Sequence, residues 1–551
     1  MSTALDARPV VRSRAGADGL AGTGVLVRSM LRRDRIRFPA WTLGLAVLMQ
    51  YFTAAIGQLV QSEEDLQGLT GFTSSGVGAL FGGVIGFDQL TIERFLVGQY
   101  GLYIILGASL MGLLTVVRHT RAEEQTGRAE LVRANVVGRH AQLTAALVMT
   151  LLMSFTVTVL VALVMIGGGY GSGGAVLFGA SIGAAGIVFG AVAAVTAQLS
   201  EYPRAAAGMA GGVLGIAFVL RGFGDMASSQ GAGPAWLSWL SPIGWSQQTG
   251  PYTYDRWWPL GISVAAACVC AAVGYYLSTR RDVGAALIPP SPGSPTLAAW
   301  VTAPAGLALR LQRPGLIGWT VSVAVAGAAF GAFTKPIADG FADAPEELTK
   351  VLGGSGDLLR GYLGVMGSTA GFLVAVFAVL AVQALKSEET EGRAEPALAC
   401  AISRTQWMTG WLAVTVAAVP VLLLAMGLGT GLGAGIGTGD ASLIGSTVLG
   451  HVAHTPAVWT VLAVAALLYG ITPRLTALVW VIVVYGYFAG MFGALLNLPD
   501  AMEWLSPFAH IGNHPADPIN GAAVAILVAV AAVIAALGLR AFGRRDLALT
   551  T

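Results

Sequence analysis

Charged side chains are rare in this sequence, at 11% of 551 residues, whereas 55% of the residues are hydrophobic. A soluble globular protein usually has about a quarter of its residues charged, so the composition excludes a water-soluble fold. Glycine is abundant, at 75 residues, but it follows no three-residue period, which excludes a collagen. The 31 basic and 29 acidic residues nearly balance, which argues against nucleic acid as a partner.

Cysteine and phosphate-binding motifs are also nearly missing. The three cysteines, Cys268, Cys270 and Cys400, offer neither a disulfide framework nor the spacing of a metal site. No G-x-x-x-x-G-K-S/T loop is present, so any ATP and its magnesium must be bound by a separate subunit. We therefore expect no catalytic residue and no cofactor in this chain.

The hydrophobic stretches have no acidic residue, lysine or arginine near their middle. An ion-coupled or proton-coupled transporter usually keeps such a group there, because ionisable residues inside a membrane are costly and are retained for function. His451 and His454 are the exception, and we favour a hydrogen-bonded helix contact for them over proton sensing. Two histidines are too few for a metal site, and we do not expect His510 and His514 to bind a metal either.

Hydrophobic runs dominate the rest of the sequence. A bilayer core about 30 Å thick requires roughly 20 apolar residues of helix. Runs of this kind occur at 39–60, 96–117, 141–167, 174–199, 204–223, 257–278, 314–334, 367–385, 405–430, 442–470, 474–496 and 519–540. We therefore predict an all-α membrane protein with about twelve transmembrane helices. Residues 1–20 have no apolar core, so we expect no cleavable signal peptide.

The distribution of lysine and arginine predicts the orientation of these helices. When the connections are assigned alternately to the two sides, starting inside, 25 of the 31 basic residues fall on the inner side. The acidic residues divide into 13 inside and 16 outside. An excess of basic residues in cytoplasmic loops is the positive-inside pattern. We expect a multi-pass protein of the bacterial inner (plasma) membrane with cytosolic N- and C-termini.

The sequence contains two copies of one half, offset by about 265 residues. The clearest copies are EEQTGRAELVRANVVGR at 123–139 and EETEGRAEPALACAISR at 388–404. Shorter repeats are Trp-Leu-Ser-Pro at 239–242 and 504–507, Pro-Arg at 203–204 and 473–474, and Arg-Arg-Asp at 280–282 and 544–546. Each half has six predicted spans and begins on the inner side, so the repeat is parallel and the halves are pseudo-symmetric.

The repeat predicts the domain organisation. A cytosolic N-terminus with an amphipathic elbow helix at the inner interface (1–38) precedes the first six-helix half (39–282). A proline-rich linker and a second elbow (283–313) precede the second half (314–551). The tryptophan- and proline-rich segments before each sixth span predict short re-entrant or interfacial helices on the outer side.

The duplicated loop is the best candidate for a docking site, because a solvated charge run has no reason to keep glutamate, glycine and arginine at fixed spacing in two diverged copies. It resembles the loop between the second and third helices of ABC-2 type exporter permeases, also called type V exporters, which has the pattern E-x-x-x-G-x-x-E followed by arginine. In that family the loop forms the coupling helix that inserts into the ATPase subunit. The resemblance implies coupling roles for Glu123, Glu124, Gly127, Arg128, Glu130, Arg139, Glu388, Glu389, Gly392, Arg393, Glu395 and Arg404.

Aromatic, methionine and one arginine side chain within the spans are the candidates for the substrate pathway. Such rings and flexible methionines bind varied apolar ligands, although each is also an ordinary packing residue. In the resembled family the first, second and fifth helices of each half flank the path. The candidates are Met49, Tyr51, Phe52, Tyr100, Tyr103, Phe218, Arg221, Trp480, Tyr485, Phe488, Met491 and Phe492.

These observations predict a permease subunit of an ATP-driven exporter of hydrophobic drugs or polyketide-type antibiotics. Its partners would be two copies of a cytosolic ABC ATPase, membrane lipids and hydrophobic small molecules. The fused twelve-helix form resembles actinobacterial, including mycobacterial, exporters of the tetronasin type. Two alternatives stay open, namely an ABC permease for a lipid or cell-wall precursor and, less favoured, a proton-coupled secondary multidrug transporter.

Overall fold

The computed structural model describes residues 18–60, 79, 82–85, 89–133, 137–229, 231, 233–282, 284–289, 296, 298–335, 358–492 and 504–546. Every regular element within these ranges is helical, so the prediction of an all-α protein is confirmed. Eleven helices among the described residues are long and apolar enough to cross a membrane. The predicted eleventh span is the exception, because the apolar helix found there, Pro473–Tyr487, is shorter.

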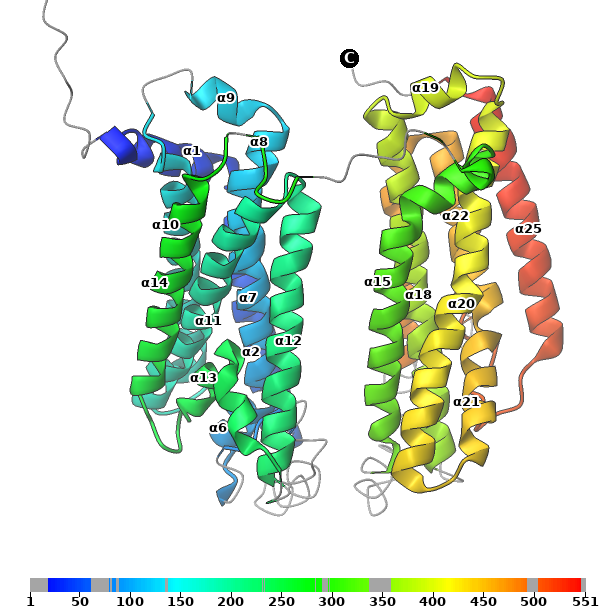
Figure 1. Ribbon diagram of the computed structural model, residues 1–551. Coiled ribbons are helices and arrows are strands. Elements are labelled where there is room, and N and C mark those ends of the chain that lie inside the picture. The colour runs from blue at the N-terminus through cyan, green and yellow to red at the C-terminus, as the bar shows by residue number, and fades with distance from the viewer. Residues whose placement is uncertain are drawn as a thin grey trace, which may run out of the picture. The chain divides into compact units, whose positions relative to one another are not determined.

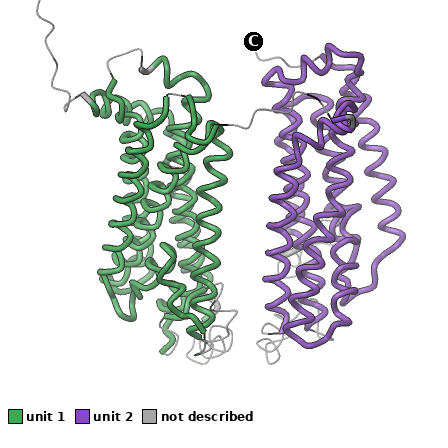
Figure 2. The backbone as a smooth tube through the Cα atoms, viewed as in Figure 1, with its two compact units in different colours: residues 1–292 green, residues 293–551 purple. Residues whose placement is uncertain are grey.

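The chain divides into two compact units, residues 1–292 and 293–551 (Figure 2). The boundary falls within the stretch expected to contain the linker. Each unit contains a bundle of long helices with its own apolar core (Figure 1).

Unit 1 begins with the short helix α1 (Thr23–Arg33), which packs across the start of α10 at one end of the bundle. Its long helices are α2 (Arg37–Leu59), α7 (Gly101–Val117), α10 (Ala141–Gly167), α11 (Ser172–Leu199), α12 (Pro203–Ser229) and α14 (Trp258–Ser278). The shorter elements are η1 (Asp18–Leu20), α6 (Ile92–Phe95), the π-helical η3 (Leu96–Tyr100) and η4 (Arg118–Ala122), α8 (Glu123–Gln125), α9 (Arg128–Arg133), η5 (Ala235–Leu240) and α13 (Pro242–Gln248). Helix α11 packs against α7, α10 and α14, and so forms the centre of the unit.

Unit 2 also consists of long helices joined by shorter helical elements, but its elements differ in number and length from those of unit 1. Its long helices are α15 (Pro304–Ala332), α18 (Leu358–Thr390), α20 (Arg404–Thr438), α22 (Thr455–Ile471) and α25 (Gly521–Arg544). The shorter elements are η6 (Ala299–Val301), α19 (Ala394–Leu398), α21 (Ser442–Ala453), η7 (Pro473–Leu478) and α23 (Val479–Phe492). The predicted tenth span is thus built from two consecutive helices, α21 and α22.

Small residues allow α15 and α20 to approach with their backbones in contact. A Cβ added at Gly327 or Gly331 on α15 would overlap the carbonyl oxygen of Met426 or Thr430 on α20. The reverse also holds, because Gly429 on α20 lies against the carbonyl oxygen of Ala324. Glycines four residues apart on both partners are typical of tightly packed membrane helices.

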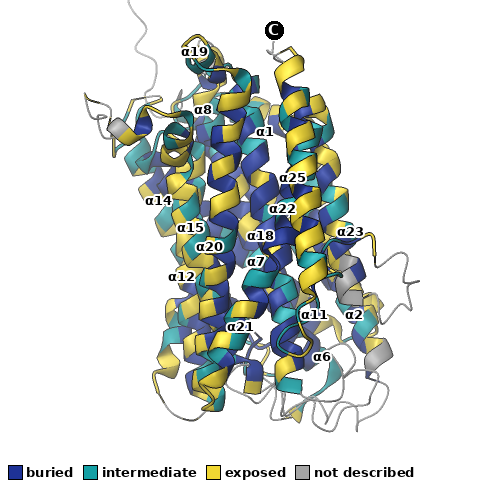
Figure 3. Cartoon of the chain, turned by 90° about the vertical axis from the view of Figure 1, so that its right-hand side faces the viewer, coloured by how far each residue is buried: buried dark blue, intermediate teal, exposed yellow. Residues whose placement is uncertain are grey.

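The last helix of unit 2, α25, packs against the rest of the unit through few residues. Only Leu527, Ala531, Gly538 and Phe542 are buried along α25, and Figure 3 shows most of the rest as exposed. Large apolar side chains such as Val533 and Leu537 lie on the exposed side. An apolar exposed face of this kind suits contact with lipid rather than water.

Two predictions about the short elements are corrected. The second amphipathic elbow is not a separate helix, because residues 307–313 form the first turns of α15, which continues through Pro314. The segment of unit 1 that was predicted to be outer does form η5 and α13, which pack between α11, α12 and α14, but the segment 504–520 of unit 2 contains turns and no helix.

Candidate functional site

The duplicated loop has the same turn in both units. Gly127 and Gly392 adopt left-handed backbone conformations with φ of 71° and 74°. The amide of Gly127 donates to the carbonyl of Glu124 at 3.1 Å, and the amide of Gly392 donates to the carbonyl of Glu389 at 3.0 Å. L-residues with a side chain rarely adopt this conformation, which explains why glycine occurs in both copies. The turn separates the preceding helix from α9 in unit 1 and from α19 in unit 2.

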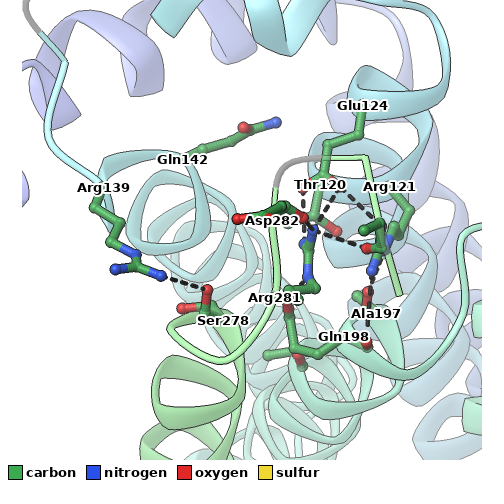
Figure 4. Close-up of polar contacts among 12 residues, drawn as sticks. Thr120, Arg121, Glu124, Arg139, Gln142, Ala197, Gln198, Ser278, Arg281 and Asp282 are labelled. Atoms are coloured by element: carbon green, nitrogen blue, oxygen red, sulfur yellow. Dashed lines mark hydrogen bonds and ion pairs between the residues drawn. The ribbon is translucent and has the colours of Figure 1, made fainter. Parts of the chain in front are cut away.

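The second glutamate of the first copy is buried inside unit 1 (Figure 4). The side chain of Glu124 is 5% exposed and forms a two-pronged ion pair with Arg281, with N···O distances of 2.8 and 2.9 Å. Arg121 also contacts Glu124, at 2.9 Å, and donates to the carbonyls of Ala197 and Gln198 at the end of α11. The carboxylate is therefore not available to a partner protein.

Glu389, the equivalent residue of unit 2, has the same arrangement. Its side chain is 1% exposed, and Arg545 binds both carboxylate oxygens at 2.6 Å. The hydroxyl of Tyr469 donates to one of these oxygens at 2.5 Å. Neither second glutamate can therefore pair directly with a partner protein, because each neutralises an arginine of its own unit.

The arginine that closes each copy of the loop is also used internally. The guanidinium of Arg139 donates to the carbonyl of Ser278 at the end of α14, at 3.4 Å (Figure 4), and to the carbonyl of the next residue, Thr279, at 2.9 Å. The guanidinium of Arg404 donates to the carbonyl of Arg545 at 2.5 Å, just after α25. In both units this residue connects the start of a long helix to the end of the last one.

The first glutamates differ between the units. Glu123 accepts a hydrogen bond from Arg33 of α1 at 2.5 Å, and this bond raises the pKa of the Arg33 guanidinium above its ordinary value. Glu388 instead pairs with Arg393 of its own loop at 2.8 Å, which raises the pKa of Arg393 in the same way. The loop of unit 1 is therefore attached to the elbow helix, whereas the loop of unit 2 is closed on itself.

Besides Arg139 and Glu391, four charged side chains of the loop are exposed, namely those of Arg128 and Glu130 in unit 1 and of Arg393 and Glu395 in unit 2. All four lie in or beside the short helices α9 and α19. A partner protein can reach these four charged residues of the motif.

Several residues at this end of the units were not assigned a site role from the sequence. Asp34, which follows α1, is 3% exposed and binds Arg118 at 2.9 Å and His119 at 2.7 Å. Arg281 and Arg545 lie in the repeated Arg-Arg-Asp sequence, so the repeat marked them, but it gave no sign of their partners.

The predicted pathway residues of the first and second spans form one aromatic cluster. Phe52 stacks on Tyr100 with ring centroids 4.5 Å apart, and it lies 6.1 Å from Tyr103 and 5.8 Å from Tyr51. Tyr51 and Tyr103 are exposed, at 59% and 44%. Met49, by contrast, is fully buried in the core of unit 1. The cluster therefore places two exposed tyrosines at the surface of unit 1, Tyr51 on α2 and Tyr103 on α7.

Arg221 does not line an open path. It is fully buried near the end of α12, where it pairs with Asp225 at 3.3 Å and donates to the carbonyl of Gly82. Asp225 accepts a hydrogen bond from Ser238 of η5 at 2.5 Å. These contacts fasten η5 to α12, so Arg221 has a structural role there. Phe218 is half-buried, and the Cζ atom of the Arg221 guanidinium lies over its ring, 5.2 Å from the ring centroid.

The candidates in the eleventh span are only partly placed. Trp480 is half-buried against the core of unit 2, and Tyr485 is half-buried as well. The side chains of Phe488, Met491 and Phe492 lie outside the described residues.

Comparison with known proteins identifies the family. The family described as "Multidrug efflux system permease Rv1217c, C-terminal domain" matches residues 28–277 and 301–543, one stretch in each unit. The chain is also 37% identical to the "Multidrug efflux system permease protein Rv1217c" of Mycobacterium tuberculosis (strain ATCC 25618 / H37Rv), over 99% of both chains. The chain belongs to the Rv1217c family of multidrug efflux permeases. As a permease it is a multi-pass membrane protein, and the family indicates a transport subunit rather than an enzyme.

In this multidrug efflux permease, His451 and His454 form contacts with neighbouring helices. His451 lies 3.2 Å from the hydroxyl of Thr430 on α20, and its Nδ1 lies 2.9 Å from the carbonyl of Thr447. His454 lies 3.2 Å from the hydroxyl of Ser368 on α18. The expected helix contacts are present, and no group of three metal ligands occurs in the described part of the chain.

Proposed function

We propose that the protein is the permease subunit of an ATP-driven ABC exporter that removes hydrophobic drugs or polyketide-type antibiotics. The observation that carries this proposal is full-length similarity to a multidrug efflux system permease. The duplicated loop supports it further, because one turn geometry with exposed charges occurs in both units. Two sites of the same design suit two copies of one partner.

The finer assignment follows the ABC-2, or type V, resemblance, including its tetronasin-type branch. Each loop would dock one ATPase subunit, which would bind the ATP and magnesium that this chain has no phosphate loop to hold. Each half would contribute six helices to the permease. The positive-inside distribution supports cytosolic loops and termini in a bacterial inner membrane.

Transport in inverted membrane vesicles tests the driving force. Vesicles with the permease and its ATPase should accumulate the hydrophobic dye rhodamine 6G only when ATP is present, and an uncoupler should leave the rate within about twofold. The His451→Gln, His454→Gln variant should keep most of this transport. Loss of transport on uncoupling, with ATP still present, would favour the secondary transporter. Movement of a fluorescent phospholipid without movement of the dye would favour the lipid-exporting alternative.

Replacing Phe52 by Ala tests the pathway. An aromatic pair contributes about 0.5–1.5 kcal/mol, so dye and drug affinities should change only a fewfold and unequally among compounds. Resistance profiles of cells for several unrelated drugs measure this change. The matched control is Phe155→Ala on α10, because Phe155 is 67% exposed. Equal loss of resistance to every drug, together with less protein in the membrane, would mean that Phe52 only packs.

A further inference from the structure

The two docking loops are attached at both ends to the last helix of their own unit. In unit 1 the attachments are Glu124 to Arg281 and Arg139 to the carbonyl of Thr279. In unit 2 they are Glu389 to Arg545 and Arg404 to the carbonyl of Arg545. The same two connections in each of two diverged halves indicate a shared requirement rather than a local accident.

We propose that Arg281 and Arg545 are positioning residues that transmit movement of each docking loop to the last helix of its unit. This inference rests on the proposed function, because it assumes that an ATPase moves the loops. Each arginine immediately follows or closely follows that helix, and each grips its glutamate with two parallel hydrogen bonds. Two-pronged contacts of this kind fix orientation as well as distance.

The surroundings make these contacts rigid. The carboxylates of Glu124 and Glu389 are 5% and 1% exposed, so water competes little for either of them. Glu124 is held from a second side by Arg121, and Glu389 by Tyr469. The loop therefore cannot move away from the last helix without breaking a buried ion pair, which is costly.

The last helices are suited to being moved. Only four residues are buried in α14, namely Pro259, Ser263, Ala267 and Gly274, and only four in α25. Each of these helices packs mainly on one neighbour, α14 on α11 and α25 on α22. A helix with one packed face can tilt on that neighbour more easily than a helix buried on all sides. In unit 1 the tilt would pivot at the end of α14 nearest the loop, because Arg281 also donates to the side chain of Gln198 on α11 at 2.7 Å.

The first experiment compares coupling with docking. The Arg281→Gln, Arg545→Gln variant, purified with its ATPase and reconstituted, should retain the ATPase and its dye-free ATP hydrolysis within about twofold of wild type. The rhodamine 6G transported per ATP should fall at least fivefold. The Arg281→Lys, Arg545→Lys variant keeps the charge but not the two-pronged contact. Its dye transport per ATP should lie between the values for wild type and for the Gln variant.

The matched control changes the neighbouring exposed arginines, in the variant Arg280→Gln, Arg544→Gln. It should transport dye with wild-type coupling. Wild-type coupling in the Arg281→Gln, Arg545→Gln variant would overturn the inference, and so would a loss of coupling that only follows loss of bound ATPase. Failure of the wild-type permease to retain any ATPase would instead overturn the proposed function.

A distance measurement tests whether the loop and the last helix move together, and it leaves the ion pair between Glu124 and Arg281 intact. Spin labels at Thr126 and Arg280 report the separation of loop and last helix, and labels at Thr126 and Tyr202 report the loop against α12. The three native cysteines are first replaced by serine. Between ATP-free and ATP-trapped complexes, the Thr126–Arg280 distance should stay constant while the Thr126–Tyr202 distance changes. A larger change between Thr126 and Arg280 would overturn the inference.

Discussion

Replacing Gly331 by Leu is expected to remove most folded protein from the membrane. A Cβ at this position would overlap the carbonyl oxygen of Thr430 and approach the amide of Ala434. Both obstacles belong to the backbone of α20, so no side chain can rotate away and the two helices must separate. Overpacking of a well-packed contact costs about 1–3 kcal/mol and occasionally more. We expect at least a tenfold loss of the monodisperse peak in size-exclusion chromatography of the solubilised, fluorescently tagged permease.

The control for this prediction lies on the same helix. Gly318 is exposed, and a Cβ added there meets no atom within 4 Å. The Gly318→Leu variant has the same change in volume and hydrophobicity and should behave like wild type. An unchanged peak for Gly331→Leu, or an equal loss for both variants, would contradict the close packing of α15 and α20.

Reversing the exposed charges of both loops is expected to weaken ATPase docking about tenfold at low salt. Glu130 and Glu395 are exposed at the start of α9 and α19, so the Glu130→Lys, Glu395→Lys variant should fold normally. Each site loses an attraction and gains a repulsion, and exposed pairs of this kind contribute up to about 1 kcal/mol each. Co-purification of the ATPase with the tagged permease measures the effect, which should shrink as salt is raised.

Asp517→Lys is the matched control for charge reversal. Asp517 is exposed and lies before the start of α25, whereas Arg545, which binds Glu389 of the loop, lies just after the end of α25. A helix of 24 residues is about 36 Å long, so Asp517 lies about that far from the loop. This variant should retain the ATPase fully. Wild-type retention by the Glu130→Lys, Glu395→Lys variant would count against docking at these loops.

The short elements could not be predicted by repetition alone. In unit 1, α1 ends at Asp34, whose carboxylate is held by Arg118 and His119. If Trp41 and Trp319 are aligned, Gln312 occupies the place of Asp34, and α15 continues through this point as one helix. One changed side chain thus accompanies a different path of the backbone.

The two segments that contain Trp-Leu-Ser-Pro differ for a comparable reason. Gly244 of α13 lies so close to the carbonyl of Ser238 that a Cβ would overlap it. The equivalent residue of the second copy is Ala509, which has that Cβ. The same Trp-Leu-Ser-Pro sequence therefore leads to a packed helix in unit 1 and to turns in unit 2.

The sequence by itself determined the all-α membrane class, most of the spans and the position of the duplicated loop. These properties follow from hydrophobic run length and from local motifs, such as the glycine that permits a left-handed turn. Only the tertiary structure decided which charges of that loop are available, since Glu124 and Glu130 look alike in the sequence. Glu124 is buried because Arg281, more than 150 residues away, binds it, and no local pattern records a contact between such distant residues.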